Sequence, residues 1–497
     1  MTDVAVDWRT SATLLGTVLK ALALPLAATA AVAAWYGEAV VPFLAPLGLT
    51  LAVGVALERF DRHDLRLREA YLMVALTWLA IALVGAIPFL IAGQGVLADP
   101  VNALFESMSG VTTTGATVID SFDAHGRSIH LWRSLLQWMG GLGILVLAVA
   151  VLSQISVGGA QLMETETQTE NVTKLTPRIE ETARLIGGIY AGLTGLMVLS
   201  WLGLHALGLA PNVTLYQAVA HAFTAVSTAG FSPQPASLGA FSPAIQWVTI
   251  LFMFTGATNF VLLYFLLQGD PTRLKNSEEF RFYLGIVLGL TALTVTFLVG
   301  SAQFRGVEPT IRHALFQVVS IVTTTGYATV DFNVWSAGAK HMLFLGMFVG
   351  GMAGSTTCSI KTVRWLVVVK SLRRDLFTEI HPEAIRPVRL SGNVVDEETI
   401  KDIYGYVLLS VVIFALLTVF IVTDATRATE HVGEFDAMGA AASTFLNIGP
   451  AFGAAGPYGS YLHFPETTKA AMIVLMWVGR IEIIPVLVIL TPAYWRS

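Results

Sequence analysis

Residues 105–117 read FESMSGVTTTGAT, and three later stretches of the chain repeat this pattern. They are FTAVSTAGFS at 223–232, FQVVSIVTTTGYAT at 316–329 and the more divergent STFLNIGP at 443–450. Their shared glycines are 115, 96 and 123 residues apart and are Gly115, Gly230, Gly326 and Gly449. Each copy lies between two apolar stretches, so the chain repeats a unit of span, short helix, Thr/Gly loop and span four times. An internal repeat of this length decides the fold.

The composition places this repeat in a membrane. Of the 497 residues 55% are hydrophobic and only 13% are charged, whereas soluble domains carry about 25% charged residues. The net charge of −5 without a basic domain argues against a nucleic-acid binder, and the apolar content argues against disorder. Cys358 is the one cysteine, which excludes an intramolecular disulfide framework and a cysteine-based zinc site.

Ten apolar stretches have the length of membrane-spanning helices. They lie at 13–36, 39–57, 70–93, 131–153, 184–209, 243–268, 282–300, 339–369, 403–423 and 467–490. Four shorter and more polar segments between spans fit re-entrant helices, at 100–114, 213–229, 309–325 and 433–448. The stretch at 13–36 is interpreted as a retained helix, because Asp3 and Asp7 are unlike the start of a signal peptide.

The predicted fold class is an all-α polytopic membrane protein with four pseudo-symmetric repeats around one central pore. Two extra N-terminal spans, assigned to residues 1–58, precede the repeats. Repeats 1 to 4 are assigned to 70–153, 184–268, 281–370 and 403–490, and the third is expected to contain an intramembrane loop.

The basic residues predict the orientation. On one side of the predicted spans lie 21 of the 29 Lys and Arg residues, including clusters around Arg59, Lys174, Arg273 and Lys370. The side with the re-entrant segments has seven, and Arg480 falls inside a span. Both termini are therefore expected in the cytoplasm and the re-entrant loops outside.

The Thr/Gly loops suit a monovalent cation. A re-entrant backbone at membrane depth is tolerated only where it lines a wet cavity or is buried in protein. Glycine permits backbone conformations that aim successive carbonyls one way, and a ring of such carbonyls can replace a cation's hydration shell. The short helices would point their negative C-terminal ends at the ion. Close packing of small residues between helices could explain one copy, but not four copies in the same setting.

On these four motifs the sequence resembles the Trk/Ktr/HKT superfamily of potassium transporters, most closely its Trk-type membrane subunits. The resemblance covers nearly the whole chain, and the extra spans at 13–57 match the Trk branch. It implies that Gly115, Gly230, Gly326 and Gly449 are filter glycines. It also implies that the residues before them offer carbonyls to K⁺, namely Thr113, Thr114, Thr228, Ala229, Thr324, Thr325, Asn447 and Ile448.

The resemblance carries further expectations. In the plant branch a serine at the first filter position is associated with sodium transport, so four glycines imply a preference for potassium. The family also implies a homodimer in the inner (plasma) membrane, regulated by a cytoplasmic ring of nucleotide-binding subunits. We expect no cofactor in this chain beyond K⁺ as the transported ion, and it has no Walker A sequence of its own. The acidic loop at 154–183 and the basic loop at 370–401 are the expected docking sites for a soluble partner.

The stretch at 339–369 is interrupted by GGMAGSTTCS at 350–359. Its glycines and small polar residues should break a helix. By resemblance this is the intramembrane gating loop, with Gly350, Gly351, Gly354, Ser355 and Thr356 as gate residues. Thr357 and Cys358 depart from the family pattern, in which further glycines are common, so their effect on gating is open. A kinked, closely packed helix is the alternative.

Arg480 lies within WVGRIEIIP at 477–485 in the last span. A mid-span arginine costs about 3 kcal/mol and normally faces a cavity or a partner. The resemblance implies that it projects into the pore as a barrier to cations and can hold the gating loop. Glu482 is a poor direct partner, because residues two apart face different sides of a helix. An ion pair with a neighbouring helix is the alternative.

Other polar residues give weaker signals. Glu106 could cap the first short helix or form an ion pair, and Asp120 and Asp331 could concentrate cations at the pore mouth or be ordinary loop residues. His221 and His313 are interpreted as structural.

The favoured function is potassium uptake through a selective, gated pore. A broken-helix secondary transporter for another small solute is the alternative, although it would show a twofold repeat. A sodium-permeable member of the same family is the other alternative. No nucleophile–base pair and no ligand motif for a catalytic metal is present in the spans, so we predict no enzyme. The coupling ion is left open.

Overall fold

The computed structural model describes residues 6–61, 66–150, 179–299, 304, 306–428 and 432–496. Most of the acidic loop predicted as a docking site, residues 154–178, lies outside the described residues, and so do Lys174 and Arg178. The regular secondary structure of the described part is helical, apart from one short hairpin of β1 (Arg389–Leu390) and β2 (Asn393–Val394). The predicted all-α fold is therefore confirmed.

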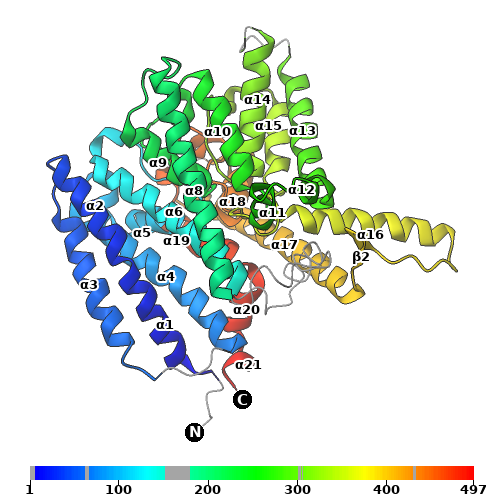
Figure 1. Ribbon diagram of the computed structural model, residues 1–497, viewed down its shortest axis with the longest axis horizontal. Helices are drawn as coiled ribbons and strands as arrows, with labels where there is room; N and C mark the ends of the chain where they lie inside the picture. Colours follow the sequence, from blue (N-terminus) through cyan, green and yellow to red (C-terminus); the bar gives the residue numbers. More distant parts are fainter. Residues whose placement is uncertain are drawn as a thin grey trace.

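Two N-terminal spans form one edge of the molecule (Figure 1). The first consists of α1 (Trp8–Ala21) and α2 (Ala23–Trp35), and α3 (Val41–Leu57) packs back against both. The spans cross where two glycines meet: a Cβ on Gly16 would lie 2.7 Å from the Gly54 carbonyl oxygen, and one on Gly54 would lie 2.8 Å from that of Gly16. Small residues let the helix backbones approach closely at this point. Lys20 and Glu58 form an ion pair beside this crossing.

The rest of the chain forms four units of span, short helix and second span. The first spans are α4 (Leu67–Ala92), α8 (Ile179–Ala206), α13 (Glu278–Leu298) and α17 (Glu397–Arg427). The short helices are α5 (Pro100–Val111), α9 (Leu215–Val226), α14 (Val307–Val322) and α18 (Glu434–Phe445). Each of the four predicted re-entrant segments therefore contains one helix that ends just before its Thr/Gly loop.

The second spans differ between the units. In the first unit α6 (Arg127–Ala150) is continuous. The other three consist of helix pairs: α10 (Pro243–Gly256) with α11 (Phe260–Leu267), α15 (Ala337–Gly346) with α16 (Thr362–Ile380), and α19 (Glu466–Arg480) with α20 (Ile483–Leu490). The short α12 (Thr272–Asn276) and α21 (Pro492–Trp495) follow α11 and α20.

The helix break predicted at 350–359 is present, but two further breaks correct the sequence prediction. The stretches at 243–268 and 467–490 were expected as continuous spans, and their helix pairs bend by 109° and 111°. In the first pair the Asn259 side chain accepts hydrogen bonds from the N–H groups of Val261 and Leu262, which starts a new helix. In the second pair Glu482 has a φ of 65°, which an α-helix does not accommodate.

The two ends of the described chain lie on the same side of the molecule (Figure 1). Val6 packs with Leu72 of α4 and Tyr494 of α21, and the Tyr494 hydroxyl donates to the Arg68 carbonyl at 2.6 Å. This arrangement agrees with the expectation that both termini are on one side of the membrane.

Each second span packs a glycine against the end of its short helix. A Cβ on Gly140 would collide with the Val111 carbonyl, one on Gly479 with the Phe445 carbonyl, and one on Gly256 would lie 2.9 Å from the Val226 carbonyl oxygen. In the third unit Gly346 faces the side chains of Ile321 and Val322. In three units the last turn of the short helix is therefore held by packing of its backbone against a glycine of the following span, and in the third unit by side-chain contacts with Gly346.

We predict that Gly479→Ala lowers the stability of the purified protein by about 1–3 kcal/mol, because the added methyl group overpacks against backbone that cannot move aside easily. Thermal unfolding in detergent measures the change. The matched control is Gly285→Ala on α13, where no atom lies within 4 Å of the new Cβ and the better helix propensity of alanine applies. Equal unfolding temperatures for the two variants would contradict the packing explanation.

Candidate functional site: a ring of four Thr/Gly loops

The four Thr/Gly loops share one unusual backbone conformation. Gly115, Gly230, Gly326 and Gly449 have φ values of 80°, 76°, 81° and 107°. Two residues before each glycine, Thr113, Thr228, Thr324 and Asn447 have φ values of 51° to 56°. Residues other than glycine seldom adopt positive φ, yet here they do so at the same position of all four loops. Positive φ at both positions is therefore shared by all four loops.

The loops close into a ring through contacts between a carbonyl and a glycine. A Cβ on Gly115 would collide with the Ala229 carbonyl oxygen, one on Gly230 with that of Thr325, and one on Gly326 with that of Ile448. A Cβ on Gly449 would lie 2.8 Å from the Thr114 carbonyl oxygen, which returns to the first loop. In each case the carbonyl belongs to the residue just before the next loop's glycine. Loops from four distant parts of the chain therefore surround one axis.

The predicted filter residues are brought together in this ring. The eight residues at the two positions before the glycines are buried, with no more than a trace of exposed surface. The Asn447 side chain joins the fourth loop to its neighbours, because its amide donates to the Thr114 hydroxyl and to the Met476 carbonyl, both at 2.8 Å.

A hydroxyl residue six positions before each glycine anchors the loop to its short helix. The carbonyl of Ser109 accepts from Thr114 N–H at 2.9 Å and from Gly115 N–H at 3.4 Å. In the second loop the N–H groups of Ala229 and Gly230 donate to the Thr224 carbonyl in the same way. In the third loop Thr325 and Gly326 donate to the Ser320 carbonyl, and in the fourth Ile448 donates to the Ser443 carbonyl. The Ser109 and Ser320 hydroxyls also donate to the carbonyl just after the glycine, at 2.6 and 2.7 Å. The sequence analysis missed these four residues, although aligning the repeats on their glycines would have found them.

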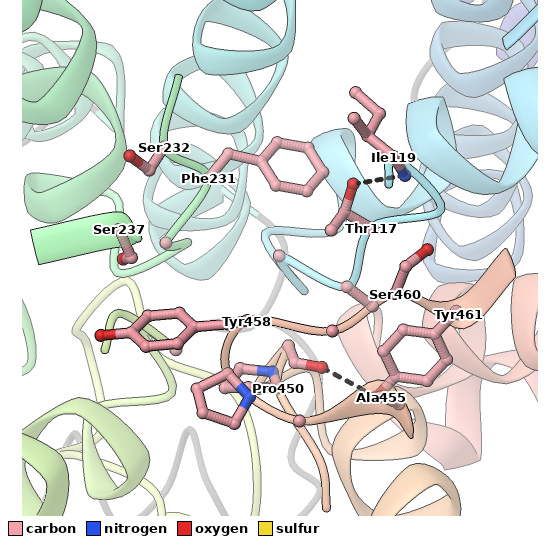
Figure 2. A pocket seen from close by; sticks show the side chains of 18 of the residues that line it. Thr117, Ile119, Phe231, Ser232, Ser237, Pro450, Ala455, Tyr458, Ser460 and Tyr461 are labelled. Carbon is pink, nitrogen blue, oxygen red and sulfur yellow. Dashed lines mark hydrogen bonds between the residues drawn. The ribbon is translucent and has the colours of Figure 1, made fainter. Parts of the chain in front are cut away.

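A cavity of about 230 Å³ opens on one side of the ring. All four filter glycines line it, and Phe231, Tyr458 and Tyr461 lie around it (Figure 2). The Tyr461 hydroxyl donates to the Gly449 carbonyl at 2.8 Å. Asp120 contributes to the lining, whereas Asp331 caps the helical turn η5 (Phe332–Val334) by accepting from Asn333 N–H.

A buried ion pair supports the first loop from this side. Arg133 of α6 lies 2.6 Å from Glu106 of α5, and both side chains are almost completely buried. Glu106 also accepts from the Val118 N–H and the Thr117 hydroxyl at 2.9 Å. The carboxylate thus joins the short helix to the segment after the filter glycine, which is a supporting position and not one within the ring.

On the opposite side of the ring, the segment between α15 and α16 lies directly under the filter loops. The Thr356 hydroxyl is 2.9 Å from that of Thr228, and the Cys358 N–H donates to the Thr324 hydroxyl at 3.1 Å. Gly351, Ser355 and the residues around them are buried. Of the residues predicted as a gate, Thr356 therefore touches the second Thr/Gly loop, and the nearby Cys358 touches the third.

Two side chains from other helices hold this segment at Ala353, and the sequence analysis missed both. The Asn259 amide donates to the Ala353 carbonyl, and Glu279 of α13 accepts from the Ala353 N–H, each at 2.8 Å. Glu279 also accepts from the Val363 N–H at 3.2 Å. A carboxylate at the start of a span is typical of a helix end facing water, so its sequence position gave no sign of this role.

Arg480 reaches the same segment from α19. Its guanidinium donates to the Thr356 carbonyl at 3.0 Å, to the Cys358 sulfur at 2.8 Å and to the Gly140 carbonyl of α6 at 2.8 Å. Arg480 is buried, and no carboxylate pairs with it within the described part of the chain. Glu482 instead pairs with Arg364 of α16 at 2.8 Å. The expectation that Glu482 would not pair with Arg480 agrees with this geometry, but the reason is the helix break between them.

The two histidines have structural environments. His221 is buried against Trp201, Phe241 and Tyr327, and its two ring nitrogens contact the Gln217 carbonyl and the Ser232 hydroxyl. His313 contacts the Thr329 hydroxyl at 2.8 Å.

We predict that Arg133→Met lowers the free energy of unfolding by about 3–5 kcal/mol, because it leaves the buried Glu106 carboxylate unpaired. Adding Glu106→Gln should recover more than half of this loss, since the amide oxygen still accepts from Val118 N–H and no buried charge remains. Denaturation of the purified single and double variants tests the pair. A double variant no more stable than Arg133→Met alone would contradict it.

Comparison with known proteins agrees with this geometry. The TrkH family model, described as "Cation transport protein", matches residues 47–497. The chain is 35% identical to the Trk system potassium uptake protein TrkH of Halomonas elongata, over 92% of each protein. It is 33% identical to that of Vibrio parahaemolyticus, over 99% of this chain and 100% of the relative. The crystal structure of the potassium transporter TrkH from Vibrio parahaemolyticus superposes with a TM-score of 0.87 at 31% identity, covering 99% of this chain and 100% of that one.

Proposed function

The chain belongs to the TrkH family of cation transport proteins, and from this we propose that it carries potassium into the cell through the ring of four loops. The family is one of transporters and not of enzymes, and the chain is a multi-pass membrane protein. The observation that carries the proposal is the closed ring, in which each filter glycine lies against the carbonyl of the residue before the next glycine.

The ring has the chemistry that a dehydrated monovalent cation needs. Carbonyl oxygens of Thr113, Thr114 and their counterparts replace the water that K⁺ loses on entry. The C-terminal ends of α5, α9, α14 and α18 direct partial negative charge toward the axis. No carboxylate is needed to hold the ion, so the site can bind weakly enough to release it.

The segment at 350–359 acts as the gate in this proposal. It touches the filter through Thr228 and Thr324, so an ion leaving the ring meets it next. Arg480 adds a positive charge at the same level and bonds the segment to α6 and α19. Conduction requires the segment to move away from the axis.

The family suggests how the protein assembles and how it is oriented in the membrane. We propose a homodimer in the plasma membrane with both termini in the cytoplasm, and a ring of nucleotide-binding subunits that docks on the cytoplasmic side and moves the gate. The membrane potential supplies about 2.3 kcal/mol per charge per 100 mV, so conduction alone can accumulate potassium.

We predict that Gly115→Ser lowers the K⁺/Na⁺ selectivity of transport by about tenfold or more, equal to ~1.4 kcal/mol between the two ions. The new Cβ collides with the Ala229 carbonyl and displaces an oxygen that lines the ring. Ion flux into liposomes loaded with a potassium- or sodium-sensitive dye measures the ratio. Gly192→Ser on α8, where the Cβ meets nothing, is the control. An unchanged ratio in Gly115→Ser would remove this loop from the filter.

We predict that Arg480→Ala increases potassium flux severalfold, because it removes the charge below the filter, two hydrogen bonds to the gating segment and one to Gly140 of α6. Arg480→Lys separates the two effects, since lysine keeps the charge but cannot reproduce the planar fork. The flux of Arg480→Lys should lie between those of wild type and Arg480→Ala. If Arg480→Ala conducts no faster than wild type, the barrier role is wrong.

A further inference from the structure

A second cavity, of about 550 Å³, lies away from the ring between α11, α12, the start of α13 and the β1–β2 hairpin. Its lining includes Leu262, Phe265, Arg273, Glu278, Arg281 and Ser391. These segments carry the basic clusters that predict the cytoplasmic side, so the cavity opens where the helices meet the inner membrane surface.

The charges around this cavity favour an anion. Its two acidic residues are already engaged: Asp270 accepts from Thr272 and Arg273, and Glu278 pairs with Lys370 and accepts from Ser391 N–H at 2.9 Å. Hydrogen bonds from Thr272 lower the pKa of Asp270, so this carboxylate stays ionised and paired. Arg273 and Arg281 also line the cavity, and Lys370 lies beside it through its ion pair with Glu278, so three basic residues face the two acids.

Two groups in the lining have hydrogen-bonding capacity left over. Arg281 is exposed, and its guanidinium makes one long hydrogen bond, 3.4 Å to the Asn276 carbonyl, within the described part of the chain. The Ser391 hydroxyl is buried and has no hydrogen-bond partner among the described residues. Arginine fork geometry and a serine hydroxyl together suit the oxygens of a phosphate group.

One wall of the cavity is apolar. It is formed by Val261, Leu262 and Phe265 of α11, whose sequence is FVLLYFLL. The Arg273 guanidinium lies over the Phe265 ring, 3.9 Å from its centre, so a cation sits beside the apolar surface. A soluble anion makes no use of such a wall, whereas a phospholipid places acyl chains along it and its headgroup against the arginines.

Both walls of the cavity bind the gating segment at the same residue, Ala353. Asn259 lines the cavity and donates to the Ala353 carbonyl, while the N–H of Phe260 donates to the Gly354 carbonyl at 3.0 Å. On the other wall Glu279, which follows Glu278, accepts from the Ala353 N–H. Any change in the separation of α11 and α13 therefore acts on Ala353 from two sides.

We propose that this cavity binds the phosphate headgroup of an anionic membrane phospholipid through Arg273, Arg281 and the Ser391 hydroxyl, and that its occupancy sets the position of the gating segment. The second part rests on the proposed function of residues 350–359 as a gate. An occupied cavity holds α11, α13 and the hairpin together and so fixes both hydrogen bonds to Ala353.

Binding is tested on the full-length protein in phosphatidylcholine nanodiscs with and without phosphatidylglycerol, by native mass spectrometry of the lipids retained after extraction. Wild type should retain phosphatidylglycerol, and Arg281→Ala should retain about tenfold less, because a charge-assisted hydrogen bond is lost. Arg59→Ala, an exposed basic residue outside the cavity, is the matched control. Equal retention in wild type and Arg281→Ala overturns the site.

Coupling is tested by potassium flux in liposomes of the same two compositions. Potassium flux through wild type and through Arg59→Ala should change at least twofold when phosphatidylglycerol is added. Flux through Arg281→Ala should stay the same. Adding inorganic phosphate or glycerol phosphate to phosphatidylcholine liposomes distinguishes the sources, and a response to either overturns the lipid assignment. Loss of lipid retention with an unchanged flux response overturns the coupling. If no composition supports potassium flux, the proposed function fails, while the retention measurement still decides the binding site.

Discussion

The structure depends on a close approach between backbones: a carbonyl of one loop lies close to where a Cβ on the preceding loop's glycine would be. Within the membrane every backbone polar group needs a partner or a wet cavity, and here carbonyls are turned away from helix bonding toward a common axis. Such an arrangement must be held from outside. The Ser and Thr carbonyls six residues earlier hold the loop N–H groups, and glycines on the second spans hold the ends of the short helices.

The fourfold pattern is strict at the ring and breaks down beneath it. Only the third unit inserts a long segment into its second span, and side chains from three of the units hold that segment. Asn259 comes from the break in the second unit, Glu279 from the third unit's first span and Arg480 from the end of α19 in the fourth. Arg480 also bonds to Gly140 of the first unit. The second, third and fourth units therefore contact the gating segment through these side chains, and Arg480 connects it to the first unit.

The sequence predicts what composition or repetition marks and misses what a single side chain decides. The four Thr/Gly loops repeat, and the break at 350–359 concentrates glycine and small polar residues, so both were predictable. The break at Asn259 lies in an otherwise apolar stretch and depends on one side chain that caps α11. The break at Glu482 depends on one backbone angle. The partners of Ala353 and Arg480 come from residues far away in the chain, and no local pattern reports such contacts. The roles assigned to the filter and gate residues remain predictions for the experiments described with them.

The partners of Arg480 determine what its charge can do in the proposed mechanism. Carbonyls and a thiol sulfur hold the guanidinium in place, but unlike a carboxylate they do not cancel its charge. The positive charge therefore persists below the filter for as long as Arg480 is bonded to Thr356. Because the same guanidinium is bonded to the gating segment and to Gly140, the segment cannot leave the axis without breaking or moving these bonds. Opening in the proposed mechanism therefore requires the bonds from Arg480 to Thr356 and Cys358 to break, or Arg480 to move with the segment and leave Gly140.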